Sequence, residues 1–311
     1  MSVAVVGAGI AGVACARALA AAGVEVVVHE RSRSVGGRMA SPRLHERPVD
    51  TGAAYFTVSS PEFDAVAGSW ADRGLAHVWT TTMGVYSPAG STTKSGPPRW
   101  SAPGGLRSLV VDLADGLDVR LGSPVSAVGP GLTVDGTAHD AVVLAMPDPQ
   151  ALSLLDSAHV AARAELADRD WRPVIAVAVG TRERTWGELT AMFVNDHPVL
   201  ALVADDGARR GDGAAVLLAH TTNALAAVHL DNPDAVVPAV LDAVADVLGG
   251  RLTVVWTHAH RWTFAQPAGS REQTHWLADG LGLCGDGWGA SKVETAWASG
   301  TAMGVAVAQS L

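Results

Sequence analysis

The first thirty residues carry the clearest hydrophobic pattern of the chain. Residues 2–7 (SVAVVG) and 24–30 (VEVVVHE) are short runs rich in Val, which predict two buried strands. Residues 10–22 (IAGVACARALAAA) between them are rich in Ala and predict a helix, which Gly23 would end. A strand, a helix and a strand within about 30 residues have the size of a βαβ unit, whose two strands are parallel neighbours in a covered sheet.

The pattern is weaker after residue 60, although further elements can be placed. Residues 84–105 are rich in Gly, Pro and Ser and predict loops or short strands between domains, and residues 205–213 (DDGARRGDG) predict a polar turn. Residues 281–311 predict a strand, a glycine-rich turn and a helix. The other predicted strands lie at 117–121, 141–146, 173–180, 214–221 and 251–258, and the other predicted helices at 106–116 and 233–248.

Composition and charge exclude several classes of protein. Of the 311 residues, 48% are hydrophobic and 17% are charged, so the chain can bury a sizeable core and does not have a disordered composition. The 22 Lys and Arg against 31 Asp and Glu give a net charge of −9, and an acidic chain gains little from a nucleic acid backbone. No run of about 18 uncharged apolar residues predicts a membrane span. We therefore expect neither nucleic acid nor a membrane as a partner.

Cysteine and histidine provide no framework for a disulfide or a metal. Cys15 and Cys284 are far apart in the sequence and have neither disulfide nor zinc spacing. The 11 His form no H-E-x-x-H pattern, so no metal site is expected. The N-terminus lacks the basic region of a signal peptide. Together these features predict a cytoplasmic protein.

A glycine motif joins the first predicted strand to the first helix. Gly7-Ala8-Gly9-Ile10-Ala11-Gly12 has the spacing G-x-G-x-x-G. The first glycine permits a tight turn, the second lets a pyrophosphate approach the backbone, and the third lets the helix pack on the strand. The free N–H groups of the helix N-terminus then attract phosphate.

Glu30 ends the second predicted strand, where an acid accepts hydrogen bonds from ribose hydroxyls. The alternative is an ordinary buried βαβ turn with a surface Glu. The motif in this context favours a dinucleotide site. The predicted binding residues here are Gly7, Gly9, Ile10, Ala11, Gly12, Glu30 and Arg31.

A second glycine pair follows at Gly36-Gly37-Arg38-Met39. Its arginine would give a pyrophosphate a forked cation, whereas a solvated turn is the alternative because several arginines cluster there. Together with the first motif and Glu30, this segment resembles the FAD-dependent amine oxidases and their relatives. The resemblance adds Gly36, Gly37, Arg38 and Met39 to the predicted cofactor-binding residues.

Further segments resemble the renalase group within these relatives. Residues 50–57 (DTGAAYFT) resemble its D-x-G-A-x-Y-F-T segment, which passes close to the flavin ring. Without the resemblance, a short buried strand with two core aromatic residues would explain them. Residues 100–106 (WSAPGGL) resemble the group's A-P-G-G element before a helix. The cofactor contacts implied by the resemblance are Asp50, Gly52, Ala53, Val125, whose backbone would contact adenine, and Ala145 and Met146 at a strand end.

The C-terminal segment carries the other part of the resemblance. Residues 285–300 (GDGWGASKVETAWASG) are similar to the element G-D-x-x-x-x-S-x-V-E-x-A-x-x-S-G, which closes the FAD site. An Asp at a strand end can accept a hydrogen bond from a ribityl hydroxyl. A helix N-terminus near the flavin stabilises the negative charge of the reduced ring. The residues concerned are Gly285, Asp286, Ser291, Lys292 and Val293.

Substrate-facing residues follow from the resemblance and from residue type. Renalases carry an H-x-R-W-like stretch, which residues 258–262 (HAHRW) resemble. A His on a strand and a Trp are each as commonly core residues, but active sites collect such side chains. The residues expected to face the substrate are His220, Arg261 and Trp262, with Tyr55, Phe56 and Trp288 as aromatic walls.

The resemblance implies an α/β protein of two domains. A glutathione-reductase-like Rossmann FAD-binding domain would comprise residues 1–60, 100–158 and 268–311. An inserted mixed α+β substrate domain, as in amine oxidases and renalases, would comprise residues 61–99 and 159–267.

The activity implied by the resemblance to renalases is that of an oxidase with non-covalently bound FAD. A hydride would pass from a small reduced substrate, a 2- or 6-dihydro isomer of NAD(P)H, to flavin N5. O2 would reoxidise the flavin and give H2O2. Because aromatisation of the substrate drives the departure of the hydride, the reaction needs stacking and alignment but no protein base.

Other functions stay open at this point. An FAD-dependent amine oxidase or dehydrogenase often holds a lysine in its substrate domain, and neither Lys94 nor Lys292 falls where such a lysine is expected. A non-catalytic binding protein of the same fold, of the Rab-escort type, tends to lose the glycine or acid positions, which are present here. Covalent flavin attachment through Cys284 is a further alternative, and the sequence does not give the oligomeric state.

Overall fold

The computed structural model describes residues 1–311 and divides into two compact units. Unit 1 comprises Met1–Met39, Arg107–Trp171 and Gln266–Leu311, and unit 2 comprises Ala40–Leu106 and Arg172–Ala265. Packing thus groups residues 40–60 with unit 2 and residues 159–171 with unit 1. The domain boundaries that the resemblance implies concern where cofactor and substrate bind, which is a different criterion from packing, and they stay a prediction.

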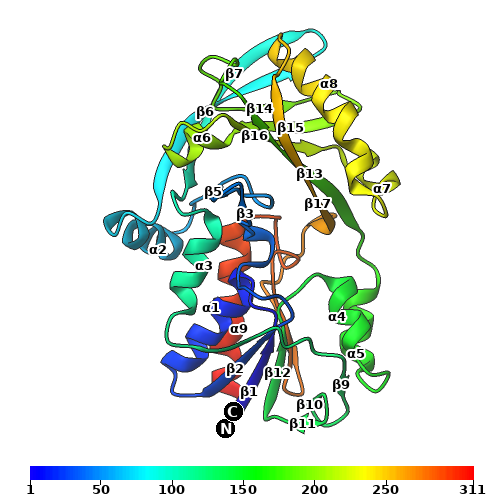
Figure 1. Cartoon of the computed structure of the whole chain (residues 1–311). Coiled ribbons are helices and arrows are strands. Elements are labelled where there is room, and N and C mark those ends of the chain that lie inside the picture. The colour runs from blue at the N-terminus through cyan, green and yellow to red at the C-terminus, as the bar shows by residue number, and fades with distance from the viewer. The chain divides into compact units, whose positions relative to one another are not determined.

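Unit 1 is built on a six-stranded sheet that is parallel except at one edge (Figure 1). All its pairs are parallel except β18, which runs antiparallel to β19. The predicted βαβ unit is confirmed, since β1 pairs with β2 in parallel and α1 (Ile10–Ala21) connects them. The strand order is β18 (Trp276–Ala278), β19 (Leu281–Leu283), β12 (Ala141–Leu144), β1 (Ser2–Val6), β2 (Glu25–Glu30) and β8 (Asp118–Leu121).

Helices cover both faces of the unit 1 sheet. On one face lies α9 (Val293–Ser310), whose Met303 packs on Gly282 of β19, next to α1. On the other face Ala151 and Leu166 pack with Leu144 and Leu283 in one core. The elements on that second face are α4 (Asp148–Leu154), α5 (Val160–Ala167) and the small sheet of β9 (Val128–Gly129), β10 (Thr133–Val134) and β11 (Thr137–Ala138). Unit 1 also contains η1 (Gly37–Met39) and most of α3 (Leu106–Ala114).

The two helices α1 and α9 approach each other through small residues. A Cβ placed on Gly300 of α9 would lie 1.9 Å from the carbonyl oxygen of Ala11, and one on Gly304 would lie 2.5 Å from that of Cys15. Neither α9, with 18 residues, nor any other helix has the length and apolar character that a membrane span needs. The close crossing fixes α1, and with it the glycine turn that precedes α1.

Unit 2 is built on an eight-stranded mixed sheet. Strands β6 and β14 pair in parallel, whereas β13–β16, β15–β16, β14–β15, β6–β7 and β5–β7 are antiparallel. The strand order is β17 (Val254–Pro267), β13 (Trp171–Thr181), β16 (Val216–Thr221), β15 (Leu200–Asp205), β14 (Ala191–Val194), β6 (His77–Ser87), β7 (Gly90–Ser101) and β5 (Phe56–Thr57). A separate hairpin consists of β3 (Arg43–Leu44) and β4 (Arg47–Pro48).

The two faces of this sheet have different covers. Ile175, Val177 and Leu217 point to one face and pack against Val240 and Val244 of α8 (Val237–Leu248). Ala176, Ala178 and Leu218 alternate with them and point to the opposite face, where Val49 and Ala54 of the segment 40–56 pack. We call this second side the inner face. The remaining elements of unit 2 are α2 (Pro61–Asp72), α6 (Asp206–Arg210), α7 (Asn223–Val228) and η2 (Pro233–Val236).

Two sequence predictions for unit 2 were wrong. Residues 84–105 contain most of the long hairpin β6–β7 instead of loops or short strands. Most of β7 is exposed on both faces, so it has no alternation of apolar and polar residues that would have revealed a strand. Residues 205–213 contain the helix α6, whose Asp206, Arg209 and Arg210 are buried. Their charges predicted solvent exposure because the sequence does not show the partners that neutralise them.

We predict that Gly300→Ala destabilises the protein because its methyl group would overlap the Ala11 carbonyl. Overpacking of this kind typically costs about 1–3 kcal/mol. Urea unfolding followed by circular dichroism measures the loss. Val305→Ala on the same helix is the control, since Val305 is 46% exposed. An unchanged free energy of unfolding in Gly300→Ala would contradict the close helix contact.

Candidate functional site

The glycine turn of unit 1 leaves space where a dinucleotide would need it. Gly7 has a φ of +104°, and a Cβ on it would lie 2.7 Å from the carbonyl oxygen of Ala145. A Cβ on Gly12 would lie 1.9 Å from the carbonyl oxygen of Gly7. Gly9 differs, because nothing lies within 4 Å of the place where its Cβ would be. Two glycines therefore allow close packing inside the protein, and Gly9 leaves open space beside the turn.

The N-terminus of α1 offers hydrogen-bond donors at this open space. Gly9 is the N-cap residue and no side chain caps the helix. The first N–H groups of a helix have no partner within it, and here no carboxylate or hydroxyl accepts from them. Ile10 and Ala11, which begin the helix, are buried. This donor set fits a phosphate group.

Glu30 holds the glycine turn in place from the end of β2. One oxygen of its carboxylate accepts a hydrogen bond from the Ala8 N–H at 2.8 Å, and the other accepts from the Ser32 N–H at 2.8 Å. The side chain is 7% exposed, so it is not the surface Glu of the alternative interpretation. Each carboxylate oxygen retains a lone pair that a ribose hydroxyl could use. Arg31, the next residue, is exposed.

The second glycine pair lies against the first turn. The Gly36 N–H donates to the Ala8 carbonyl at 2.9 Å, and a Cβ on Gly37 would lie 3.4 Å from the Cα of Gly9. Met39 is buried at the end of η1. The two glycine motifs, which the sequence separates by about 30 residues, therefore form one cradle within unit 1.

Arg38 and Asp286 come together although 248 residues separate them. The guanidinium donates to both carboxylate oxygens, at 2.8 and 2.5 Å, and lies over the ring of Trp171 at 5.2 Å from its centroid. Ser291 donates a further hydrogen bond to Asp286 at 3.1 Å. The sequence motifs assigned the arginine and the aspartate to separate parts of a cofactor. The structure places them side by side, at the ends of the segments that carry both motifs.

The start of α9 follows shortly after Asp286 in the sequence. The helix begins at Val293 with Lys292 as its N-cap, and no side chain caps it. Ser291 and Lys292 are exposed, and Gly285 has a φ of +140°. Its N–H donates to the Ser299 hydroxyl at 2.9 Å, which fixes the turn against the helix.

Cys284 precedes the same turn and is buried. Burial raises the pKa of its thiol to about 12. The group is therefore protonated near neutral pH, and a protonated buried thiol is a poor nucleophile.

An arginine cluster that the sequence analysis missed surrounds Gly287. Arg271 lies over the ring of Trp288 at 4.2 Å from its centroid and forms an ion pair with Asp148 at 3.0 Å. A Cβ on Gly287 would meet Asp148, Trp171 and Arg169 at 3.3–3.4 Å. Burial raises the pKa of the Asp148 carboxyl, and the arginines oppose that shift. Trp288 is 4% exposed and belongs to this packed cluster. No local pattern in the sequence identifies these residues, because they come from four separate places in the chain.

The remaining cofactor residues expected in unit 1 line the core of the sheet. Val125 and Met146 are half-buried and pack against the core that contains Leu144. Ala145 lies directly after β12, where Gly7 approaches it. These positions are compatible with the sequence expectation, which stays a prediction.

In unit 2, each residue of the segment 50–54 except Ala53 is held by a different side chain. Arg210 forms an ion pair with Asp50 at 3.0 Å, and the Trp262 indole N–H donates to the Thr51 carbonyl at 2.7 Å. His220 forms a hydrogen bond with the Gly52 backbone, and Arg209 donates to the Ala54 carbonyl at 2.7 Å. Gly52 is buried and Ala53 is half-buried. The segment is therefore fixed to the inner face of the unit 2 sheet.

The charges under this segment are ion-paired. Asp206 bonds to both Arg209 and Arg210, and Arg47 lies 2.7 Å from it. Burial opposes ionisation of Asp206, but the three guanidinium groups outweigh it and hold the pKa of the carboxyl below its usual range. Asp50 is fully buried and also accepts from the Ser41 hydroxyl and the Leu106 N–H.

His220 is a neutral imidazole on the inner face. Burial and the nearby Arg209 lower its pKa from 6.5 to about 4. Its Nε2 is buried and has no hydrogen-bond partner. The side chain therefore offers one unused nitrogen without carrying a charge near neutral pH.

The structure separates the other expected substrate residues. Tyr55 and Trp262 are half-buried and belong to the clusters on the inner face, like His220. Phe56 is 2% exposed and packs among Phe63, Trp70 and Trp100, so its ring lies in a core beside α2. Arg261 alternates with Trp262 along β17, is exposed, and donates to the Leu230 carbonyl at 2.6 Å. Only Tyr55, His220 and Trp262 thus share the inner face.

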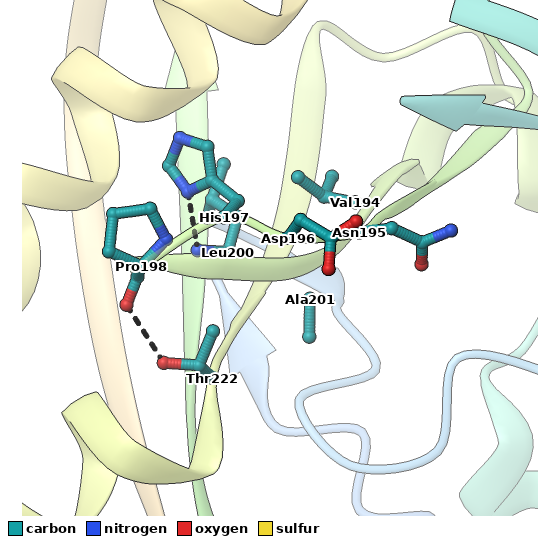
Figure 2. Close-up of a pocket in the computed structure, with 8 residues that line it drawn as sticks. All are labelled: Val194, Asn195, Asp196, His197, Pro198, Leu200, Ala201 and Thr222. Carbon is teal, nitrogen blue, oxygen red and sulfur yellow. Dashed lines mark hydrogen bonds between the residues drawn. The ribbon is translucent and has the colours of Figure 1, made fainter. Parts of the chain in front are cut away.

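A hollow in unit 2 contains none of these residues. Figure 2 shows its side chains around the turn between β14 and β15, with a volume of about 730 Å³. His197 accepts hydrogen bonds there from the Val199 and Leu200 N–H groups, both at 3.1 Å, so its Nδ1 is occupied. Thr222 donates to the Pro198 carbonyl at 3.0 Å. Asp196 and His197 are the ionisable residues that line this hollow, and neither is among the expected site residues.

A second hollow of about 360 Å³ lies in unit 1. It is lined by residues 164–169 in part and by residues 268–271, among them Arg169 and Arg271. Both arginines are engaged with neighbouring carbonyl groups, at 3.1 Å from Ala268 and 2.7 Å from Glu165 respectively.

Comparison with known families gives two matches to the sequence. Residues 5–70 match the NAD(P)-binding Rossmann-like domain, and residues 61–307 match the flavin containing amine oxidoreductase family. The second match covers well over half of the chain. The expected fold class and the resemblance to flavin amine oxidases are confirmed, while the renalase group is not tested by these matches.

Solved structures with the same fold cover the whole chain. Cyclohexylamine oxidase from Brevibacterium oxydans IH-35A has a TM-score of 0.79 at 14% identity, with 99% of each chain covered. A redesigned putrescine oxidase has a TM-score of 0.78 at 17% identity, with 99% of this chain and 98% of that chain covered. A fatty acid isomerase from P. acnes has a TM-score of 0.69 at 12% identity, with 97% of each chain covered. Their named activities differ, so the likeness shows the fold alone.

We predict that Glu30→Gln weakens flavin binding, because the amide would present a donor where Ala8 and Ser32 already donate. Loss of a hydrogen bond to a charged group costs about 1.5–3 kcal/mol, which is roughly a 10- to 150-fold rise in Kd. Titration of the apoprotein with FAD, followed by quenching of flavin fluorescence, measures the change. Glu25→Gln at the exposed start of the same strand is the control. Equal affinity in both variants would contradict the assignment of Glu30.

We predict that His220 makes the protein less stable as the pH falls from about 6.5 toward 4. The unfolded state takes up a proton in this range and the native state does not, since the native pKa of His220 is about 4. Between pH 7.5 and pH 5, the free energy of unfolding should fall by about 1–2 kcal/mol less in His220→Gln than in the wild type. Urea unfolding at both pH values measures this, with His229→Gln as the control. A parallel pH dependence in the wild type and His220→Gln would show that the native imidazole is not held neutral.

Proposed function

The chain belongs to the flavin containing amine oxidoreductase family, and on that premise we propose that it is a renalase-like oxidase of 2- and 6-dihydro isomers of NAD(P)H. The flavin is proposed to be FAD, bound without a covalent link. When bound, FAD supplies the acceptor for a hydride and passes the electrons to O2, which gives H2O2.

The residues of unit 1 support FAD as the flavin. The open space at Gly9, the uncapped start of α1 and the buried Glu30 suit the diphosphate and the ribose of a dinucleotide. Arg38 and Asp286 add a cation and an acceptor on segments that carry family motifs. Non-covalent binding is supported by the protonated state of Cys284, whose pKa is raised to about 12. Retention of all these positions argues against a non-catalytic binding protein.

The observation that carries the substrate class is the character of the inner face of unit 2. Its half-buried rings, Tyr55 and Trp262, and the neutral His220 provide stacking surface and one unused polar nitrogen. The three buried carboxylates of unit 2 are each ion-paired with arginine: Asp50, Asp205 and Asp206. An alkylammonium group would therefore find no free buried carboxylate there. A neutral, planar dihydropyridine ring needs none.

The proposed reaction requires little acid–base catalysis by the protein. A dihydronicotinamide becomes aromatic as it loses a hydride, so no side chain has to remove a proton. The protein's task is to orient the ring by stacking and hydrogen bonding. Neutral His220 suits this task, because a cationic imidazolium would oppose the positive charge that develops on the pyridinium product.

Amine oxidation is the second candidate. Two structures with this fold are named as oxidases of amines, cyclohexylamine and putrescine. Against it, the two lysines of the chain, Lys94 and Lys292, are both exposed. No buried lysine is therefore available to the role that the enzyme class often gives to one.

The proposal predicts which reductants bleach the bound flavin. Under anaerobic conditions, absorbance near 450 nm should fall rapidly with 6-dihydro-NAD and its 2-dihydro isomer and remain with ordinary 4-dihydro-NADH. Primary amines and polyamines form the third arm of the stopped-flow experiment. Bleaching by an amine alone would replace the proposal by amine oxidation. Bound flavin that no compound reduces would leave the family standing and refute the proposed substrate.

A further inference from the structure

We propose that Arg99 and Trp79 of hairpin β6–β7 form a subsite for a phosphate group of the substrate. The inference rests on the proposed function, because phosphates are the only anionic groups of a dihydronicotinamide nucleotide. It adds a contact that would determine substrate specificity, made by residues outside the sequence motifs that resemble the family. Both residues lie in unit 2 and face the aromatic cluster of Tyr55 and Phe193.

Arg99 is a buried cation without a carboxylate partner. It is 8% exposed, and its one hydrogen bond is a long one of 3.4 Å to the Pro97 carbonyl. Its Nε is buried and has no partner. The other two buried arginines, Arg209 and Arg210, each form ion pairs with aspartate. Arg99 alone of the three keeps its positive charge unbalanced.

Aromatic rings hold the Arg99 guanidinium in one orientation. It lies 5.5 Å from the ring centroid of Tyr55 and 5.9 Å from that of Phe193. Contacts with ring faces orient a guanidinium but accept none of its N–H bonds at the edge of its plane. Apart from the long bond to the Pro97 carbonyl, the donors of Arg99 therefore remain available to a ligand, and a planar guanidinium matches the oxygens of a phosphate in a bidentate manner.

Trp79 supplies a second donor at the same cluster. Its indole N–H is buried and has no partner, and its ring packs against the group that contains Tyr55 and Phe193. The pairing of β6 with β7 is irregular between Val78 and Thr80, which places Trp79 at a bulge. Bulges re-aim side chains and are frequent next to active sites.

The two unsatisfied donors point to one kind of ligand. Buried polar groups are nearly always hydrogen-bonded, and a buried charge without a counter-charge is costly. Here two donors without a partner, the Nε of Arg99 and the indole N–H of Trp79, lie at rings that are only half-buried, and the positive charge of Arg99 meets only the Pro97 carbonyl at 3.4 Å. An oxyanion satisfies all three at once, whereas an ammonium group would be repelled. Tyr55 links the subsite to the expected substrate residues because it contacts Arg99 directly.

The test compares substrates that differ in phosphate content. The holoenzyme is assayed with the 6-dihydro forms of nicotinamide riboside, nicotinamide mononucleotide and NAD. Removing the phosphate should raise KM roughly 10- to 100-fold and change kcat far less, since the contact positions the substrate away from the reacting ring. Inorganic phosphate should compete with the mononucleotide.

Variants assign this effect to the two side chains. In Arg99→Met the ratio of the riboside KM to the mononucleotide KM should fall to about 1, and competition by inorganic phosphate should disappear. Trp79→Phe keeps an aromatic ring and removes only the N–H, so it should lower the ratio severalfold. Arg99→Lys keeps the positive charge but removes the planar, bidentate arrangement of donors. Its KM ratio should therefore lie between those of Arg99→Met and the wild type. Arg251→Met, at an exposed arginine, is the control and should retain the wild-type ratio.

The outcomes separate the inference from the proposed function. Equal KM values for riboside and mononucleotide in the wild type, or a wild-type ratio in Arg99→Met, would overturn the subsite while the function stands. If none of the three compounds reduces the flavin, the proposed function fails. Calorimetry with oxidised nicotinamide mononucleotide then decides about the subsite by itself. Binding by the wild type that Arg99→Met loses would support it, and absence of binding by the wild type would overturn it.

Discussion

The buried ion pairs beneath the segment 50–54 are the constraint on which unit 2 depends. Asp50, Asp206, Arg209 and Arg210 neutralise one another inside the protein. Removing one member of such a set leaves a buried charge uncompensated, at a cost of about 3–5 kcal/mol. The set therefore permits one arrangement of the segment it holds. That arrangement brings the backbone of Thr51 and Gly52 to Trp262 and His220, so the buried charges help to determine the geometry of the inner face.

Unit 1 achieves comparable precision through backbone contacts. Gly12 and Gly300 occupy positions where a Cβ would lie 1.9 Å from a carbonyl oxygen. The helix α1 is thus held against the sheet on one side and against α9 on another. Its uncapped N-terminus has a fixed direction before any ligand arrives, and the cost of ordering a phosphate site is met during folding. The buried ion pairs in unit 2 and the glycine contacts in unit 1 therefore both hold a candidate binding surface in a fixed geometry before a ligand binds.

The parts that could be predicted from sequence are those with local signals. The first βαβ unit and the succession of strand, turn and helix over residues 281–311 were predicted correctly, because strand period, turn glycines and helix composition all lie within about 30 residues of sequence. The helix α6 was missed, since its charged residues are buried together with partners such as Asp50, about 160 positions away in the sequence. Arg99 and Trp79 were missed for a related reason: their distinguishing feature is the lack of a partner, which no sequence pattern records.

Local charge, and not net charge, decides what a ligand meets. The chain carries a net charge of −9, which taken alone would favour a cationic substrate. The buried acids of unit 2 form ion pairs with arginines, and Arg99 lies beside Tyr55 without a carboxylate partner. The inner face is therefore neutral to positive although the molecule is acidic. Surface acids lie beyond effective reach of such a site, because solvent and salt screen them over about 10 Å, whereas a buried guanidinium acts at full strength on a group in contact with it.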